Sequence, residues 1–196
     1  MRSIRHSLLW LVGMVVVVAS GCQTRTDASG STPERPATNA PVIAHNRWVH
    51  HFTELRDLVK TADAVVVGTI TGEERGAITG PKGEQIQDRL LYVAVEERLA
   101  GRLSGNSLTL AEQGWLLLPE GERPFVVHGT QRLSPGDRGV FAVVKNRNGP
   151  YYHIINDQGS FLLTDGKIVR SNRSDDLVRR VERLPEADLK RLVRTG

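Results

Sequence analysis

The sequence contains one cysteine, Cys22, among 196 residues. A single thiol excludes an intramolecular disulfide and a zinc site built from several cysteines. Aromatic residues make up only 5% of the chain, so a hydrophobic core would depend mainly on Val, Leu and Ile. The roughly 150 residues after Asn46 are enough for one domain held together by its core alone.

Several catalytic signatures are also missing. The chain has no Gly-x-Ser-x-Gly, no Walker loop, no His-Glu-x-x-His and no Gly-x-Gly-x-x-Gly. The acidic pairs Glu73-Glu74 and Glu96-Glu97 and the histidines His50-His51 are explained as solvated surface groups. We therefore expect no catalytic residue, no metal and no cofactor, and a protein that is not an enzyme.

The charge is only weakly basic. The formal net charge is +4, and it falls to +2 without Arg2 and Arg5, which lie in a segment expected to be removed. The pI of 9.6 therefore overstates the case for an acidic partner, and nucleic acid is not expected.

The N-terminus has the pattern of a secretory signal, predicted over residues 1–21. Arg2 and Arg5 precede an almost wholly apolar run, residues 8–19, which is short for a membrane span. The run ends in Ala19-Ser20-Gly21-Cys22, which resembles the lipobox of bacterial lipoproteins. The resemblance implies that Cys22 is lipidated and anchors the protein to the cell membrane or outer membrane, with its domain on the extracytoplasmic side. A plain signal peptide and a free thiol would be the alternative.

The next segment has a different composition. Residues 22–46 comprise Cys22 and a stretch dominated by Ser, Thr, Ala, Pro and Asn. Such a stretch buries too little apolar surface to offset its ordering entropy, so we expect a disordered spacer that spans roughly 25–30 Å.

Residues 47–196 are predicted to form one globular domain of the mainly β class. Apolar residues at helical spacing indicate a short helix over 53–60 and a helical segment over 175–184 that resumes after Pro185. Residues 72–84 are expected to be a polar connection, and Ser134-Pro135-Gly136-Asp137 a turn. β-Branched and alternating patterns predict strands at 64–71, 85–99, 107–112, 139–145, 151–155, 160–163 and 167–169.

One segment is unusually apolar for a connection. Residues 114–129 read GWLLLPEGERPFVVHG. They indicate either a hairpin or lid over the open edge of a barrel, which is the favoured interpretation, or the apolar rim of a ligand site. The residues of such a rim would be Trp115, Phe125, Tyr151 and Tyr152.

The order of these signals carries a second resemblance. A short helix leads to Ala62-Asp63-Ala64-Val65-Val66-Val67-Gly68, a long strand ends in Ala100-Gly101, and Leu133-Ser134-Pro135-Gly136-Asp137 precedes Val140-Phe141-Ala142-Val143. Over roughly residues 52–165 this layout resembles uncharacterised bacterial envelope domains and the netrin/TIMP-type OB barrel. It implies a small OB-like β-barrel with a short N-terminal helix and a C-terminal helical segment. TIMP-type inhibitors use an N-terminal cysteine and disulfides, which this domain lacks, so protease inhibition is not carried over.

These patterns predict a lipid-anchored cell-envelope protein that acts as a binding or interaction module. Its partner would be another envelope protein or a wall polymer. The alternatives are an envelope hydrolase with an unrecognised site and a structural lipoprotein that binds wall polymer.

Overall fold

The computed structural model describes residues 41–44, 51–127, 132–156, 158–169 and 176–196, and it confirms a mainly β protein. The helices are α1 (Leu55–Thr61), α2 (Asp176–Val181) and α3 (Glu186–Thr195). The strands are β1 (Val42–Ala44), β2 (Ala64–Thr79), β3 (Gln85–Gly101), β4 (Ser107–Leu118), β5 (Gly121–Val127), β6 (Arg138–Lys145), β7 (Tyr152–Ile154), β8 (Ser160–Thr164) and β9 (Lys167–Val169). The predicted signal segment and most of the spacer, Cys22 included, lie outside the described residues.

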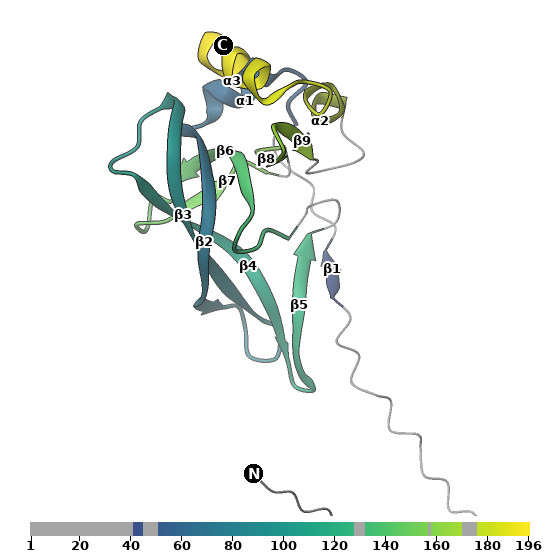
Figure 1. Cartoon of the computed structure of the whole chain (residues 1–196). Coiled ribbons are helices and arrows are strands. Elements are labelled where there is room, and N and C mark those ends of the chain that lie inside the picture. The colour runs from purple at the N-terminus through teal and green to yellow at the C-terminus, as the bar shows by residue number, and fades with distance from the viewer. Residues whose placement is uncertain (1–40, 45–50, 128–131, 157, 170–175) are drawn as a thin grey trace, which may run out of the picture. The chain divides into compact units, whose positions relative to one another are not determined.

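Five strands close into a barrel. β2 pairs antiparallel with both β3 and β6, β3 pairs with β4, and β6 pairs with β7. A parallel contact between Leu110 of β4 and Tyr152 of β7 completes the ring β2–β3–β4–β7–β6. β8 and β9 continue the sheet beyond β6, while β5 and β1 continue it beyond β4. Figure 1 shows the three helices together at one end and the β4–β5 hairpin reaching the other.

The first half of β2, from Ala64 to Ile70, is buried on both faces and lies at the centre of the barrel. Val66 is 0% exposed and lies in the barrel interior with Leu91, Leu110 and Phe141. Its neighbours Val65 and Val67 point the opposite way, into a second apolar cluster that includes the buried residues of all three helices. A strand buried on both faces needs no polar alternation, which explains the uninterrupted run of valines.

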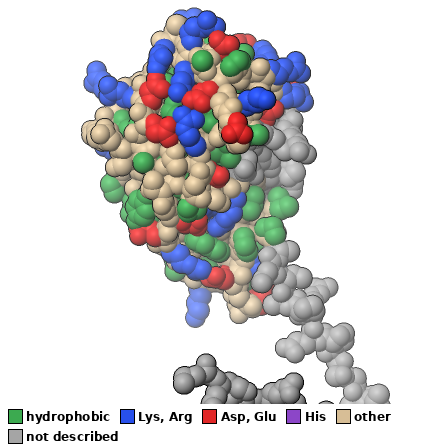
Figure 2. Space-filling view, in the orientation of Figure 1, with side chains coloured by type: hydrophobic (Ala, Val, Ile, Leu, Met, Phe, Trp, Pro, Cys, Tyr) green, Lys and Arg blue, Asp and Glu red, His purple; other side chains and the backbone are tan. Residues whose placement is uncertain are grey.

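Polar contacts hold the helical end against the barrel. The buried Gln158 side chain accepts a hydrogen bond from the Phe52 N–H at 2.8 Å and donates one to the Phe52 carbonyl at 2.8 Å, ahead of α1. On α3, Glu186 accepts two hydrogen bonds from Arg138 of β6, at 3.0 and 3.1 Å, and pairs with Lys190 at 2.6 Å. These hydrogen bonds lower the pKa of Glu186 to about 2. Figure 2 shows basic and acidic side chains intermixed over this end.

Three sequence predictions change in the structure. The connection predicted over 72–84 is wrong for most of its length, because β2 continues to Thr79 and pairs with β3 as far as Ile86. The strand predicted over 107–112 continues to Leu118 for the same reason, since its partner β3 is long. Val42–Ala44, assigned to the spacer, form β1 parallel to β5, so the structured region includes residues before the predicted boundary at 47.

Two other predictions are confirmed. Residues 114–127 form a hairpin, because β4 and β5 pair from Trp115↔Pro124 to Leu118↔Gly121. The turn at 134–137 forms as well, with the Ser134 N–H donating to the Asp137 carboxylate at 2.7 Å. In the part of the chain that the structure covers, no helix has the length and apolar character needed to cross a membrane.

We predict that Val66→Asp unfolds the domain. The change would place an unpaired carboxylate inside the barrel, which should cost about 4 kcal/mol or more. Ile78→Asp is the matched control, because Ile78 lies on the same strand and is 51% exposed. Urea denaturation followed by circular dichroism measures both. A cooperative transition of wild-type midpoint in Val66→Asp would contradict the packing described here.

We also predict that Glu186→Gln lowers stability in a pH-dependent way. The folded-state pKa of about 2 lies below the ordinary value of 4.5, so the carboxylate stabilises the fold fully above pH 4.5. That contribution is lost as the pH falls from 4.5 through 2. After allowance for solvent screening, the difference from wild type at pH 7 should be about 1–2 kcal/mol. Denaturation midpoints of the two proteins should therefore converge at low pH, and a constant gap from pH 7 to pH 2 would contradict the assignment.

Candidate functional site

The candidate site lies on β2, β3 and β4, and alternation along the strands gives it two faces. In a strand, successive side chains point to opposite sides of the sheet. On β3, Arg89 and Leu91 point inward, and Leu91 is part of the barrel interior. Asp88, Leu90 and Tyr92 therefore point outward. The inner face and the outer face carry different sets of polar side chains.

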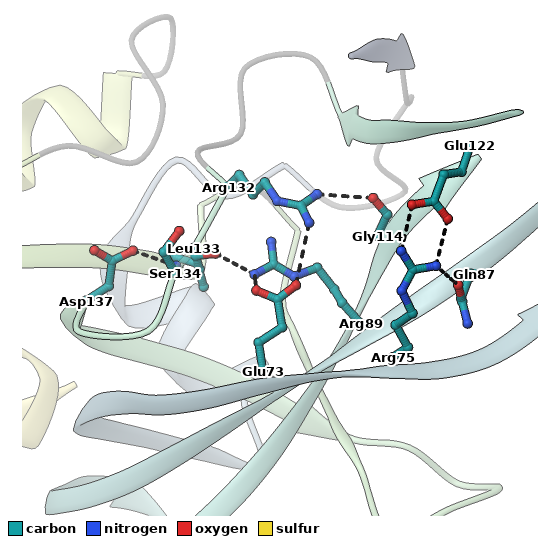
Figure 3. A network of polar contacts seen from close by, with 10 residues as sticks. All are labelled: Glu73, Arg75, Gln87, Arg89, Gly114, Glu122, Arg132, Leu133, Ser134 and Asp137. Atoms are coloured by element: carbon teal, nitrogen blue, oxygen red, sulfur yellow. Dashed lines mark hydrogen bonds and ion pairs between the residues drawn. The ribbon is translucent and has the colours of Figure 1, made fainter. Parts of the chain in front are cut away.

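A buried arginine dominates the inner face. Arg89 is 1% exposed, and its Nη2 donates to Glu73 Oε2 at 2.7 Å and to the Leu133 carbonyl at 2.6 Å. Arg132 also reaches Glu73, at 3.5 Å, and donates to the Gly114 carbonyl at 3.1 Å. Figure 3 shows Arg89 and Arg132 converging on the Glu73 carboxylate. The network thereby joins β2, β3 and β4 to the segment at Leu133.

A second ion pair lies nearer the hairpin tips. Arg75 forms two hydrogen bonds of 2.7 Å to Glu122 of β5 and one of 2.8 Å to Gln87 of β3. Its guanidinium carbon also lies 4.5 Å from the centre of the Trp115 ring, and that of Arg132 lies 5.2 Å away. Trp115 is thus held by two cation–π contacts within the protein.

Burial shapes the ionisation of the inner face. Desolvation raises the pKa of the Glu112 carboxyl and lowers that of Arg89, although nearby opposite charges act against both shifts. Arg89 Nε and Nη1 are buried and have no hydrogen-bond partner among the described residues. Most of the charge here is paired within the molecule, so the inner face fits a structural role.

The outer face brings together groups that the inner face does not use. Strand register aligns Gly72, Tyr92 and Thr109 in one row, and Glu74, Leu90 and Ala111 in the next. β7 runs parallel to β4 from the Leu110–Tyr152 pair, which places Tyr151 beside the first row and His153 beside the second. We call this set the tyrosine face: Gly72, Glu74, Asp88, Leu90, Tyr92, Thr109, Ala111, Tyr151 and His153.

One glycine of β2 makes room for its side chains. A Cβ at Gly76 would lie 3.2 Å from Leu90 and 3.1 Å from Asp88, which is tighter than ordinary contact. A Cβ at Gly72 would lie 3.4 Å from the Tyr92 ring and would make only ordinary contact. The side chains of Leu90 and Asp88 therefore lie across the bare backbone of β2 at Gly76.

Two polar pairs lie on the tyrosine face, Tyr92 with Glu74 and Asp88 with His153. Interaction with Glu74 is the main reason why the pKa of Tyr92 is raised, and burial, the Glu74 charge and Tyr151 add to the shift in that order. Burial raises the pKa of Asp88, and nearby His153 acts in the opposite direction. Tyr92 is 38% exposed, so the ring can be reached from solvent.

Both ring nitrogens of His153 have polar partners within the protein. Its Nδ1 lies 2.9 Å from the Ala111 carbonyl oxygen, and its Nε2 lies 3.1 Å from the Asn146 amide nitrogen. A carbonyl can only accept, so Nδ1 carries the proton and Nε2 accepts from Asn146 in the neutral ring. Both ring nitrogens therefore have partners within the protein, and the ring is positioned rather than available as a base.

The four residues predicted as a ligand rim divide into two groups. Trp115 and Phe125 lie on the β4–β5 hairpin, and Trp115 faces the inner network. Phe125 follows Pro124, the partner of Trp115, and so points to the other side of β5. Tyr152 pairs with Leu110 and packs against the barrel interior. Tyr151 alone belongs to the tyrosine face.

Sequence reasoning missed the other functional candidates, Glu74, Asp88, Tyr92 and His153. The alternation of residues 88, 90 and 92 within a predicted strand could have grouped two of them. The approach of β7 had no sequence signal, because a parallel contact between distant strands leaves no local pattern. No group of three His, Cys, Asp or Glu side chains is placed to hold a metal ion among the residues covered by the structure.

Comparison with known proteins does not assign the chain to a family. No protein-family model matches it, and curated proteins give no significant match.

We predict that Arg89→Ala strongly destabilises the domain and that Arg75→Ala does not. The first change leaves Glu73 and the Leu133 carbonyl without their buried donor, which should cost about 3 kcal/mol. Arg75 is the matched control, since it is 48% exposed and forms a surface ion pair. Chemical denaturation measures both variants. Equal midpoints for the two would contradict the distinction between a buried and an exposed network.

Proposed function

We propose that the chain is a lipid-anchored binding module of the bacterial cell envelope and that it takes its ligand on the tyrosine face. The observation that carries the proposal is the pairing of Tyr92 of β3 with Thr109 of β4, with Tyr151 directly before the β7 residue that pairs with the neighbouring Leu110. Exposed aromatic rings beside carboxylates and amides are typical of a recognition surface. Neither Tyr92 nor Tyr151 contributes to either apolar cluster of the core.

The barrel supports an OB-like assignment. The ring order β2–β3–β4–β7–β6, with its single parallel contact between β4 and β7, is that of a five-stranded Greek-key barrel. In OB barrels the face formed by the second and third strands binds oligonucleotides or oligosaccharides. The tyrosine face is centred on the second and third strands of this ring, β3 and β4. A likeness to netrin/TIMP-type barrels stays a proposal at the level of layout.

Binding fits the face better than hydrolysis does. The raised pKa of Asp88 is a property that a general acid would need, and it is the observation that favours the alternative of an envelope hydrolase. The one histidine of the face, His153, already has partners on both nitrogens. A hydrolase would need a free base or nucleophile beside Asp88, so a binding surface is the simpler assignment.

The anchor in this proposal is Cys22. The apolar run at 8–19 and the Ala19-Ser20-Gly21-Cys22 motif support it, and two or three acyl chains anchor a protein stably where one does not. A spacer of low complexity would then hold the barrel away from the lipid surface, where its tyrosine face meets the polymers or proteins of the envelope.

The function is tested in two measurements on the full chain. Cys22→Ser should abolish labelling by a fatty-acid analogue and release the protein from the membrane fraction. The double variant Cys22→Ser with Ser29→Cys, which moves the thiol into the spacer, should also stay unlabelled. Labelling that persists in Cys22→Ser would show that Cys22 is not the anchor.

The second measurement concerns binding. Detergent-solubilised wild-type protein should be retained on insoluble envelope material, and Tyr92→Ala should lower the retained fraction several-fold. Ile78→Ala, at a 51% exposed position of β2 outside the tyrosine face, should be retained like wild type. Equal retention of all three proteins would exclude the tyrosine face as the binding surface.

A further inference from the structure

The charge of the tyrosine face differs from the charge of the whole chain. The sequence has a pI of about 9.6, which by itself favours an anionic polymer as partner. The ionisable groups of the tyrosine face are two carboxylates, Glu74 and Asp88, with His153 and two tyrosines. The set contains no Lys or Arg, so it offers a phosphate or carboxylate polymer no permanent positive charge.

We infer that the tyrosine face binds an uncharged, hydroxyl-rich saccharide chain, which extends along the row Tyr92–Thr109–Tyr151. This inference rests on the proposed function and adds the chemical class of the ligand. It differs from the expectation that basic composition alone would suggest.

The shape of the face suits a chain of sugar rings. Tyr92 and Tyr151 lie two strands apart, at about 10 Å for a strand spacing of about 4.8 Å. The small side chain of Thr109 lies between them, while Leu90 and Ala111 in the next row are each only 7% exposed and support the face from below. Aromatic rings bind the C–H surface of a sugar, and the small Thr109 between them lets the chain approach the sheet.

The polar groups of the face are mainly acceptors or positioned donors. The Glu74 carboxylate lies near Tyr92 and has lone pairs for sugar hydroxyls. Asp88 is half-buried beside His153, and His153 is fixed by Ala111 and Asn146. Fixed acceptors around two rings give a saccharide both orientation and apolar contact, whereas they offer an anion no cationic donor.

A cationic ligand is the competing class, because two carboxylates would attract an ammonium group. Both carboxylates already have neighbours within the face, because Glu74 interacts with Tyr92 and Asp88 lies near His153. Carboxylates with such neighbours favour hydroxyl donors over a fixed positive charge. The salt dependence of the binding affinity distinguishes the two ligand classes. Binding of a charged ligand weakens as ionic strength rises, whereas binding of an uncharged saccharide does not.

The test uses the purified full chain in detergent and three defined probes: chitopentaose as the uncharged saccharide, polyphosphate as the anionic polymer, and polylysine as the cationic one. Isothermal titration calorimetry at 50 and 300 mM salt measures each. Chitopentaose should bind with an affinity that is independent of salt, and neither charged polymer should compete with it. Tighter, salt-sensitive binding of polyphosphate or polylysine would overturn the inference.

Variants locate the binding. Tyr92→Ala should weaken chitopentaose binding about tenfold, while Tyr92→Phe, which keeps the ring, should stay within about threefold of wild type. Glu74→Gln should weaken it through the lost acceptor, and Ile78→Ala should leave it unchanged. Saccharide binding that survives Tyr92→Ala and Glu74→Gln would overturn the site. Retention on envelope material without any binding of chitopentaose would overturn the ligand class and leave the proposed function standing.

Discussion

The buried Arg89 guanidinium is the interaction on which the extended part of the barrel depends. It joins β3 to Glu73 of β2 and to the Leu133 carbonyl, and Leu133 itself is 1% exposed in the barrel interior. A charge this deeply buried is tolerated only where its partners are fixed, and removal of one partner leaves the rest uncompensated. The network therefore sets the position of three strands at the point where they leave the closed barrel. Because the same strands carry the tyrosine face on their outer side, the network also fixes the backbone under that face.

Alternation along β3 links stability to the proposed function. Residues 87, 89 and 91 face an internally paired and apolar environment, while residues 88, 90 and 92 face outward on a rigid support. A recognition surface built on paired strands keeps its side chains in place before the ligand arrives, which reduces the entropy lost on binding. Gly76 adds to this by letting Leu90 and Asp88 pack against the backbone of β2.

The helical end has a different character. Glu186, Arg138 and Lys190 form ion pairs between α3 and the barrel, and Lys190 also pairs with Glu97 at 3.1 Å. The arginines and lysines of this end thus serve partly to hold α3 in place. Its basic residues add to the pI of the chain without forming a surface of one sign, so whole-chain charge is a poor guide to the partner.

The sequence alone determined the elements whose signal is local. The run at 64–70 predicted a buried strand because β-branched residues favour that environment, and Ser134 to Asp137 predicted a turn because each residue suits it. Strand ends were missed where pairing overrides local composition. Residues 73–79 include two glutamates, an arginine and a glycine, yet they form strand because β3 lies beside them. Val42–Ala44 became β1 for the same reason, since only the edge of β5 makes them a strand. Closure of the barrel, the burial of Arg89 against Leu133 and the meeting of Tyr92 with Tyr151 and His153 were decided by the tertiary structure, because each brings together residues 40 or more positions apart whose proximity no local pattern encodes.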